Sequence, residues 1–488
     1  MSVGGRLVLL ALLASAACGQ RDAQPVQRER PDLVLVVVDA LRADHLNSYG
    51  YRRATSPALA SLAASGVVFE DNTAQSSATL PSMVSLLLGR AILADAQRVP
   101  AGVATLAERL AAAGYQTVAF AGNPLISRAA GFDRGFEVFL TREDTGHQTW
   151  DMRDLYTIVT GWLEANPRDG RPRFLYVHFM DPHFPYWPDD RPALPGEDPA
   201  TSLEQRVRLG DDVTAAWAAD VGVAGAGTPL FERFNAERWT VLEQIDAYDR
   251  EIANVDAAAG TLLASLGAAS RLVVVAADHG EAFWERRLPP KALESLPPDE
   301  RTLSRMFEHG HGGSLCQALL RTPLIVSGYG FPVGVRVTAA ASNLDIAPTL
   351  LRAAGLPADP ALEGRPLQDL LPGAPGGAAA RAPIPSVSRT AVALRDPSGY
   401  RLVVPTAEGE ALGLAVQLYK LSDDPHERRN LAALPLAETT EADAKMLQQL
   451  KAAHDAALSG FTLFEGQSLV CDDPAQARVI AELEGSRP

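Results

Sequence analysis

LVVVAADHGE, residues 272–281, is the stretch of sequence that decides the fold. Its apolar, β-prone run is bounded by charge and glycine, which is typical of a buried strand, so Asp278 and His279 are expected where that strand leaves the sheet. A second run, LVLVVVD at residues 33–39, also ends on a carboxylate. Ligands of open parallel α/β sheets bind outside the carboxyl ends of the strands, so Asp39, Asp278 and His279 are predicted to meet in one crevice. Either run alone is better explained by solvated turn residues, but together they favour a metal site.

The composition is that of an ordinary globular protein. The chain has 488 residues, of which 47% are hydrophobic and 21% charged, so it is long enough for one large domain and a smaller one. Its formal net charge of −15 argues against a nucleic-acid partner, because phosphate backbones select basic surfaces. A local metal and histidines could still attract a small anionic substrate.

The N-terminus has the pattern of an export signal. Arg6 precedes an apolar stretch, residues 7–17, that is interrupted only by Ser15 and is shorter than the ~20 residues needed to span a bilayer. The small residues before Cys18 resemble a bacterial lipoprotein processing site, although leucine is usual where Ser15 stands. We therefore expect residues 1–18 to be a signal, Cys18 to be lipidated, and residues 19–30 to be a flexible tether. The protein would then be periplasmic or on the cell surface of a bacterium, and plain secretion with cleavage near Cys18 is the alternative.

Thr79 stands at the start of a predicted helix. The segment TLPS, residues 79–82, precedes an apolar run and Gly89, and Thr, Pro and Gly suit the cap, the first turn and the exit of a helix. Helical and strand patterns then alternate, which predicts βαβ units and a mostly parallel sheet. The helical patterns cover residues 104–113 and 151–164, and the strand patterns cover residues 116–121 and 174–180.

The second half of the chain holds an insertion, a long helix and a domain boundary. Residues from 185 to about 234 are rich in Pro, Asp and Ala without periodicity, and we expect an insertion over the site that serves as a lid, a substrate wall or decoration. Residues 237–266 predict a long helix, and residues 285–306, with four prolines, predict an exposed loop. The Pro/Gly/Ala-rich stretch 372–385 would separate a catalytic domain, residues 31–375, from a small antiparallel C-terminal subdomain, residues 376–488.

Thr79 is also a candidate nucleophile. It places an alcohol at a helix N-terminus, where free backbone N–H groups and the helix dipole favour an anion. An unactivated alcohol is a poor nucleophile at neutral pH, but coordination to a divalent cation lowers its pKa. A plain helix cap is the competing interpretation, and the other candidate residues of the site favour the nucleophile.

Four of the nine histidines fall into two clusters. His178 and His183 lie in HFMDPHFPYW, and His309 and His311 lie in EHGHGG. Loops shaped by Pro and Gly could aim these side chains at the non-bridging oxygens of a transferring phosphoryl or sulfuryl group. We assign His311 and His178 catalytic roles first, and His183 and His309 to substrate binding; a single histidine would more often be structural.

The ligand set predicts one divalent metal ion. Asp39, Asp278, Thr79 and His279 offer three oxygens and one nitrogen. The imidazole favours manganese, zinc or magnesium, with calcium less suited because it prefers oxygen ligands. No cysteine spacing typical of a zinc site is present, so Cys316 and Cys471 are expected to be structural, paired or not.

Eight segments together resemble the sulfatase family within the alkaline phosphatase superfamily. In chain order they are VVVDALRADHLNSYGY, ATLPSMVSLLLGR, YDREIANVDAAAGTLL, VAADHGE, EHGHGGSL, LRTPLIV, NLDIAPTLL and LYKLSDDPHERRNLA, between about residue 31 and residue 433. The resemblance implies a large α/β domain with a mixed, mainly parallel sheet flanked by helices, and a small C-terminal domain with a four-stranded antiparallel sheet. It also implies a metal at the ends of the strands that hold Asp39 and Asp278.

The chain departs from the sulfatase pattern at the nucleophile and at one ligand. Sulfatases usually carry a Cys or Ser, converted to formylglycine, in a Cys-x-Pro-x-Arg type motif, and here that motif reads TLPSM, with Thr79 first and Met83 last. Threonine cannot be oxidised to that aldehyde. The second of two consecutive aspartates usual after the first strand is Ala40. The remaining set is similar to the threonine-dependent phosphotransferases of the superfamily, such as lipoteichoic acid synthases and phosphoethanolamine transferases, which are usually embedded in the membrane by several helices.

The sequence thus predicts an exported, metal-dependent, sulfatase-like hydrolase that cleaves phosphodiester or phosphonate monoester bonds through Thr79. The expected substrate is an anionic ester of a small molecule, a glycan or a lipid head group, and membrane contact is expected only through Cys18. Three alternatives stay open: a sulfatase that works without formylglycine, a phosphotransferase, and an inactive member that binds an anion.

Overall fold

The structure, a computed structural model, describes residues 30–92, 96–145, 152–186, 194–198, 200–203, 229–266, 270–295, 307–375, 381–435 and 438–460. Its centre is an eight-stranded sheet in which the middle strands run parallel. In sheet order the strands are β11 (Val335–Val337), β2 (Val67–Phe69), β10 (Leu324–Gly328), β7 (Arg271–Ala277), β1 (Asp32–Val38), β6 (Arg173–Phe179), β4 (Gln116–Ala121) and β5 (Val138–Thr141). Strand β10 runs antiparallel to both of its neighbours, so the sheet is mixed and mainly parallel, as predicted.

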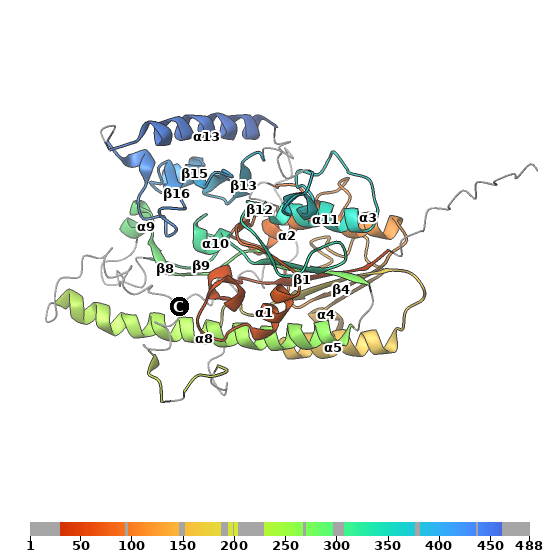
Figure 1. The fold of residues 1–488 in the computed structure, drawn as a ribbon. Coiled ribbons are helices and arrows are strands. Elements are labelled where there is room, and N and C mark those ends of the chain that lie inside the picture. Colours follow the sequence, from red (N-terminus) through yellow and green to blue (C-terminus); the bar gives the residue numbers. More distant parts are fainter. Residues whose placement is uncertain are drawn as a thin grey trace, which may run out of the picture.

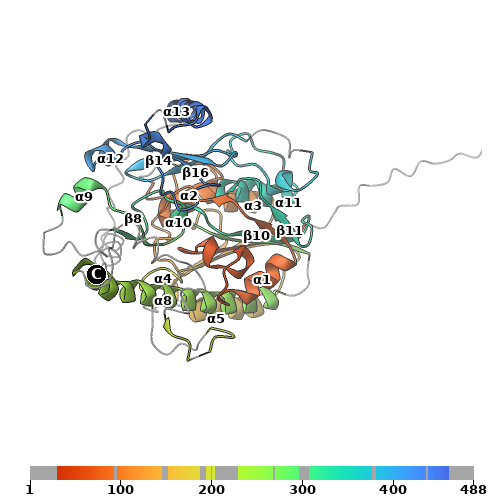
Figure 2. The ribbon, with the colours of Figure 1, turned by 60° about the vertical axis from the view of Figure 1, so that its left-hand side comes forward.

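Helices cover both faces of this sheet (Figures 1 and 2). One face carries α2 (Thr79–Leu88), α3 (Leu106–Ala112) and α11 (Ile346–Ala353). The other face carries α1 (Pro57–Ala64), α5 (Met152–Ala165) and the long α8 (Pro229–Ser265). Short elements complete the domain: β3 (Asn72–Thr73), β12 (Ala341–Ser342) and α4 (Arg142–Thr145).

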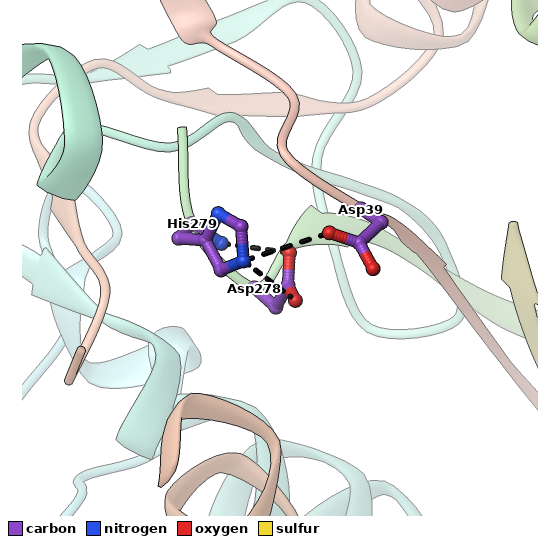
Figure 3. A group of neighbouring side chains, drawn as sticks. All are labelled: Asp39, Asp278 and His279. Atoms are coloured by element: carbon purple, nitrogen blue, oxygen red, sulfur yellow. Dashed lines mark hydrogen bonds and ion pairs between the residues drawn. The ribbon is translucent and has the colours of Figure 1, made fainter. Parts of the chain in front are cut away.

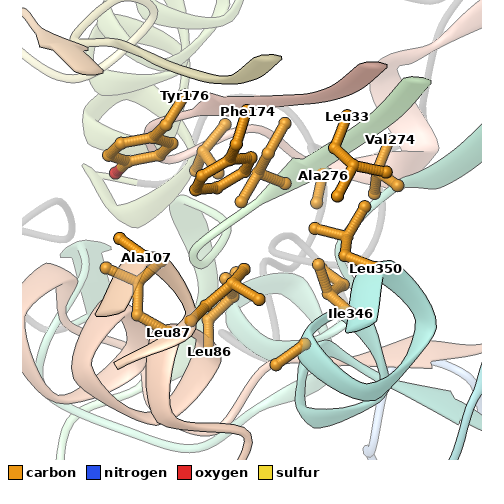
Figure 4. Close-up of a cluster of buried hydrophobic side chains, with 14 of the residues drawn as sticks. Leu33, Leu86, Leu87, Ala107, Phe174, Tyr176, Val274, Ala276, Ile346 and Leu350 are labelled. Atoms are coloured by element: carbon orange, nitrogen blue, oxygen red, sulfur yellow. The ribbon is translucent and has the colours of Figure 1, made fainter. Parts of the chain in front are cut away.

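Strand β1 shows why its sequence is an unbroken apolar run. Side chains of a strand alternate between faces, and here Leu33, Leu35 and Val37 join the core under α2 while the residues between them join the core over α8. Figure 4 shows the first of these cores, with Leu33 and Phe174 of the sheet facing side chains of α2 and α11. Each fully buried Leu or Val contributes roughly 1.5–3 kcal/mol, so burial on both faces fixes β1 at the centre.

A hairpin and two short helices lie between β7 and β10 in the chain. The hairpin pairs β8 (Ala282–Arg287) with β9 (Phe307–Gly310), and α9 (Pro290–Ser295) and α10 (Gln317–Leu320) flank it. The expectation of an exposed loop over residues 285–306 is therefore wrong for residues 285–287 and 290–295. Strand β8 pairs with β9 alone, so it needs no continuous apolar run. Its charged residues and the prolines that follow it are typical of a loop, and the sequence pattern therefore does not predict this strand.

The C-terminal part is a four-stranded antiparallel sheet with a helix on its outer face (Figure 1). Its elements are β13 (Ile384–Val387), β14 (Ala391–Arg395), β15 (Tyr400–Pro405), α12 (Ala407–Ala411), β16 (Gln417–Lys420) and α13 (Glu441–Gly460). This matches the expected antiparallel subdomain. The sheet reaches the large domain through β13, where the Val387 N–H donates to Gln75 O at 2.7 Å and Ser386 Oγ donates to Ala74 O at 2.6 Å.

Several expectations fall outside the described residues. These are the signal at residues 1–18, the tether up to residue 29, Cys471, and most of the insertion expected over residues 185–234. Helix α8 begins at Pro229, within the last residues of that expected insertion. Among the described residues, no helix combines the length and the apolar character that crossing a membrane requires.

Candidate metal and catalytic site

The site lies where four neighbouring parallel strands end. Strands β7, β1, β6 and β4 are consecutive in the sheet, and polar residues lie at or just beyond the carboxyl end of each. Asp39 follows β1, and its backbone N–H donates to Phe179 O at 3.0 Å. Asp278 and His279 follow β7, and Gly280 then packs directly on α10, where a Cβ would come within 2.0 Å of Ala318 O. Only glycine allows this close approach, which fixes the place of His279.

Asp39, Asp278 and His279 form a compact, fully buried group (Figure 3). His279 Nε2 lies 3.5 Å from Asp39 Oδ1 and 3.4 Å from Asp278 Oδ2. Within the part of the chain that the structure describes, neither of these carboxylate oxygens has a hydrogen-bond partner, although both are buried. Ligands with metal bonds of about 2.1 Å in tetrahedral geometry lie about 3.4 Å apart, so these atoms fit a divalent cation.

Hydrogen bonds fix which atoms of this group face the metal position. His279 Nδ1–H donates to Gly280 O at 2.9 Å, so the neutral imidazole directs the lone pair of Nε2 toward the carboxylates. Asp278 Oδ1 accepts the backbone N–H groups of His279, at 2.8 Å, and Ala40, at 3.2 Å, so Oδ2 is left for a metal. The ligand atoms are thus oriented before any metal binds.

The two carboxyl groups differ in pKa. Burial and the nearby negative charge of Asp39 raise the pKa of Asp278 above its ordinary value. For Asp39, burial acts in the same direction, but His178, His183 and His279 outweigh it and lower the pKa. Burial lowers the pKa of His279, which favours its neutral, ligating form. A proton taken up by this pair therefore goes to Asp278 rather than to Asp39, and a divalent cation would compete with that proton.

Thr79 faces this group from α2. Its Oγ1 lies 3.2 Å from His279 Nε2, and its side chain is buried. The expectation that Thr79 caps the helix is not met: Ala78 is the N-cap residue, and Thr79 is the first residue inside the helix. The hydroxyl group is therefore free of backbone capping and is directed at the candidate metal position.

Two histidines from separate loops lie beside His279. The His311 ring centroid is 4.3 Å from that of His279 and 4.6 Å from that of His183, so the predicted clusters do meet. His311 Nδ1 contacts Glu281 Oε1 at 3.0 Å, and His183 Nδ1–H donates to Phe184 O at 2.5 Å. In both residues Nε2 is the ring atom that remains for a substrate.

The other two predicted histidines lie elsewhere. The His309 ring stacks on Trp284, with 4.1 Å between centroids, and also packs against Phe283 and Phe184. His178 lies inside β6, fully buried, with Nε2 3.6 Å from Asp39 Oδ2. It is thus a neighbour of a candidate ligand, and it does not share the stack formed by His183 and His311.

Three polar residues near the site escaped the sequence analysis. Asn123, just past β4, donates from Nδ2 to Asp39 Oδ2. Tyr176 OH lies 2.7 Å from His178 Nδ1. Glu281 is buried, and although burial alone would raise its pKa, His311, His183 and His309 lower the pKa to about 2. A polar residue shortly after a strand, two positions for Asn123 and four for Glu281, was the available signal, but it is also the signal of an ordinary turn.

Ala40 occupies the place of the missing second aspartate. Its φ of 52° is in the left-handed region, which costs a non-glycine residue of the order of 1 kcal/mol. Its N–H donates to Asp278 Oδ1, and its carbonyl accepts from Tyr248 OH at 2.6 Å. The backbone of Ala40 therefore contributes to the site even though its side chain offers no ligand.

A cavity of about 950 Å³ lies next to the site, between the β8–β9 hairpin and the C-terminal sheet. Gly312 and Gly313, which follow His311, form part of its wall, as do Arg286, Tyr419 and Glu427. The wall includes none of the candidate metal ligands, so this space is an adjoining cavity and the chemistry lies at the strand ends.

Comparisons with known proteins agree with this geometry. The sequence model of the Sulfatase family matches residues 31–356. Human arylsulfatase A is 26% identical over 518 residues, which cover 95% of this chain and 94% of that enzyme. Choline-sulfatase of Rhizobium meliloti is 27% identical over 318 residues, and the match spans 60% of this chain and about half, 52%, of that protein.

Solved structures share the fold at low sequence identity. A protein solved in complex with its substrate D-glucosamine-2-N,6-O-disulfate has a TM-score of 0.65 at 17% identity, with 89% of this chain and 99% of that chain covered. The phosphonate monoester hydrolase of Agrobacterium radiobacter has a TM-score of 0.61 at 19% identity, with 88% and 96% covered. Proteins of this fold thus include enzymes for sulfuric esters and for phosphonate esters.

Proposed function

The chain belongs to the sulfatase family, and we propose that it is a metal-dependent hydrolase that cleaves phosphodiester or phosphonate monoester bonds with Thr79 as its nucleophile. The observation that carries the proposal is the position of Thr79 Oγ1, 3.2 Å from His279 Nε2 and next to two unpartnered carboxylate oxygens. Members of this family are hydrolases of sulfuric or phosphoric esters, so the open question is the atom that is attacked.

A threonine nucleophile favours phosphorus over sulfur. A formylglycine hydrate has a second hydroxyl group that can expel sulfate from the covalent intermediate without attack at sulfur, and a threonine sulfate has none. A phosphothreonine can be resolved by in-line attack of water on phosphorus. The fold shared with a phosphonate monoester hydrolase is compatible with this assignment.

Asp39, Asp278 and His279 would hold one divalent cation, and manganese, zinc or magnesium suits two carboxylates and an imidazole better than calcium does. When bound, such a cation would lower the pKa of the Thr79 hydroxyl group and offset negative charge on the substrate. Members of the superfamily use a divalent metal ion, and which metal this chain uses belongs to the proposal.

The remaining steps fall to side chains of this chain. Thr79 Oγ1, after losing its proton to solvent, forms a bond to phosphorus while the bond from phosphorus to the leaving oxygen breaks. His311, oriented by Glu281, gives its Nε2 proton to that leaving oxygen and takes one back when water attacks the phosphothreonine and releases Thr79. His183 Nε2 contacts a non-bridging oxygen of the substrate.

The substrate class follows from this site only in outline. It is an anionic ester of a small molecule, a glycan or a lipid head group, and the cavity beside His311 offers room for the leaving group. His309 would bind the substrate only through the aromatic wall formed with Trp284. Export, with an anchor at Cys18, completes the proposal and is tested by fractionating cells that express the full chain with or without Cys18→Ser.

Intact mass spectrometry tests the nucleophile directly. The signal-free protein is loaded with Mn²⁺, Zn²⁺, Mg²⁺ or Ca²⁺ and briefly exposed to bis-p-nitrophenyl phosphate, p-nitrophenyl phenylphosphonate or p-nitrophenyl sulfate. We expect a phosphoryl or phosphonyl adduct, with matching release of p-nitrophenol, in the wild type and in Ser85→Ala. Ser85 is the matched control because its hydroxyl group lies on the same helix and donates to Pro81 O. The adduct must be absent in Thr79→Ala.

The same experiment separates the alternatives. Faster cleavage of the sulfate than of both phosphorus esters would mean a sulfatase that works without formylglycine. A product in which added glycerol becomes phosphorylated would mean a phosphotransferase. Metal binding without any adduct or turnover would mean an inactive, anion-binding member, and an adduct that persists in Thr79→Ala would exclude Thr79.

A further inference from the structure

The carboxylate of Asp39 has two oxygens in different surroundings. Oδ1 has no hydrogen-bond partner among the described residues and lies 3.5 Å from His279 Nε2, on the side of the candidate metal. Oδ2 accepts from Asn123 and faces His178. Since Asp39 is fully buried, whatever holds Oδ2 also determines where Oδ1 points.

Asn123 is itself held in one orientation. Its Oδ1 accepts the backbone N–H of Leu125 at 2.7 Å, which leaves only Nδ2 to face Asp39. The side chain is 1% exposed and belongs to the turn after β4, so it has little freedom to move. A buried amide that is fixed at one end and donates at the other end is a rigid support for a carboxylate.

His178 and Tyr176 approach the same oxygen from β6: His178 Nε2 lies 3.6 Å from Asp39 Oδ2, just beyond hydrogen-bond distance, and has no other partner among the described residues. Burial and the charges of Asp278 and Asp39 raise the pKa of Tyr176 well above its ordinary value, so its hydroxyl group stays protonated. If Tyr176 OH donates to His178 Nδ1, the neutral ring carries its proton on Nε2, which faces Asp39 Oδ2. The other tautomer would place two lone pairs opposite each other, so the first tautomer is favoured.

We propose that Asn123, His178 and Tyr176 act together as positioning residues that orient Asp39 for the metal, and that they set the metal affinity of the site without contacting the substrate. His178 thereby becomes a positioning residue instead of the catalytic residue that its sequence motif predicts. The inference rests on the proposed metal site but not on the proposed substrate. Residues that hold metal ligands from outside typically change metal affinity 10–100-fold when they are removed.

Metal titration of the full-length mature protein tests the proposal. The apparent Kd for Mn²⁺ is measured by isothermal titration calorimetry for the wild type and for Asn123→Ala, His178→Leu, His178→Gln and Tyr176→Phe. We expect Kd to rise about 10–100-fold for Asn123→Ala and His178→Leu, and less for His178→Gln, which keeps a donor, and for Tyr176→Phe. Tyr115→Phe is the matched control, because its hydroxyl group is equally buried but donates to Pro31 O, at the opposite end of the sheet, and its Kd should be unchanged.

Kinetics at saturating Mn²⁺ provide the second readout. If these residues only position Asp39, excess metal restores kcat and leaves KM for the ester unchanged. Tyr176→Phe removes a single oxygen atom, so it keeps the test valid should His178→Leu fail to fold. Wild-type Mn²⁺ affinity in Tyr176→Phe, His178→Gln and Asn123→Ala, or a raised KM that excess metal cannot correct, would overturn the inference. Absence of Mn²⁺ binding in the wild type would instead overturn the proposed metal site.

Discussion

The hydroxyl group of Thr79 does not cap α2, because the residue before it occupies the N-cap position. Ala78 occupies the N-cap with φ of −135° and has no side chain that could cap the helix, so Thr79 begins α2 with its hydroxyl group unused by the backbone. The helix N-terminus adds positive potential at this position. The hydroxyl group of Thr79 can therefore interact with a metal or a substrate instead of with the backbone of α2.

Substitutions at Thr79 should separate the hydroxyl group from the methyl group. We expect Thr79→Ala to lower kcat/KM for the best phosphorus ester by ~10³-fold or more, because the bond-forming oxygen is gone. Thr79→Ser keeps that oxygen and should retain measurable activity and adduct formation. Steady-state kinetics at saturating metal make the comparison. Equal activity of the Ala and Ser variants would show that the hydroxyl group is not the nucleophile.

Cys316 is expected to be chemically inert in the folded protein. Burial, with the nearby charges of Glu308 and Glu427, raises the pKa of its thiol to about 12. At pH 8 the thiolate fraction is then ~10⁻⁴, compared with about a quarter for a free cysteine of pKa ~8.5. Dithiobis(nitrobenzoate) should not label signal-free Cys471→Ser protein at pH 8, and should label one thiol per chain in guanidinium chloride. Fast labelling of the native protein would mean that the adjoining cavity opens to expose the thiol.

The sequence predicts some residues of the site and not others for a physical reason. Asp39, Asp278 and His279 directly follow continuous apolar runs, so their position at a sheet edge is a local property. Asn123 gives no such signal, because its role depends on a partner 84 residues away and asparagine after a strand is an ordinary turn residue. His178 could not be separated from His183 by spacing, since only the end of β6 at Phe179 decides which of them stays inside the sheet.

At the scale of elements, a buried ion-pair cluster joins the loop after β1 to α8. The Arg53 side chain is fully buried and pairs with Asp249, also fully buried, and with Asp246. His45 and Tyr51 bond to the same Asp249 carboxylate, at 2.7 and 2.6 Å. These contacts fix α8 along the face of the sheet that leads to the site.

Removing the cation from this cluster should be costly. We expect Arg53→Met to lower the free energy of unfolding by about 3–5 kcal/mol, because buried carboxylates lose their counter-charge. Arg336→Met is the control, since the Arg336–Glu70 pair is 49% and 32% exposed and should contribute less than about 1 kcal/mol. Urea unfolding followed by circular dichroism measures both. A cost for Arg53→Met as small as for the control would show that α8 is held by apolar packing alone.

Element limits could be predicted where burial is two-sided. The strand expected over residues 116–121 coincides with β4, and that expected over residues 174–180 differs from β6 by one residue at each end. Helix α8 starts eight residues earlier than expected, because PLFERFNA, residues 229–236, directly follows the Pro-, Asp- and Ala-rich stretch and its helical spacing of Leu230, Phe231 and Phe234 is too short to stand out from it. One-sided or irregular elements such as α9 depend on tertiary packing and leave no comparable pattern.

At the scale of the whole molecule, metal binding at the ends of the central strands should stabilise the folded state. A cation bound by Asp39, Asp278 and His279 binds only the folded protein, so it stabilises the fold by about 2.7 kcal/mol at a concentration 100 times Kd. We expect EDTA to lower both Tm and activity, and Mn²⁺ to restore them. Asp278→Asn should show a Tm that does not respond to Mn²⁺. A wild-type Tm insensitive to both EDTA and Mn²⁺ would contradict the metal site.

The order of the strands along the chain also determines when the site can form during synthesis. Strand β1 is among the first parts to leave the ribosome, yet its neighbours β6 and β7 follow far behind, with Ala40 and Asp278 separated by 238 residues. The segment before Thr79 gains its partner later still, because Ala74 bonds to Ser386, which lies 312 residues further along the chain. At ~5–20 residues per second this is a delay of roughly 15–60 s during translation.

A chain exported while still unfolded would therefore complete its site only after crossing the membrane. The metal would then be chosen from the ions of the destination compartment rather than from those of the cytoplasm. A chain that stops at residue 375 lacks β13 and should gain no protection from proteolysis by Mn²⁺, whereas the complete chain should. For a chain exported in this way, the late arrival of β13 would make the place of folding, as much as the ligand set, a determinant of which metal the protein binds.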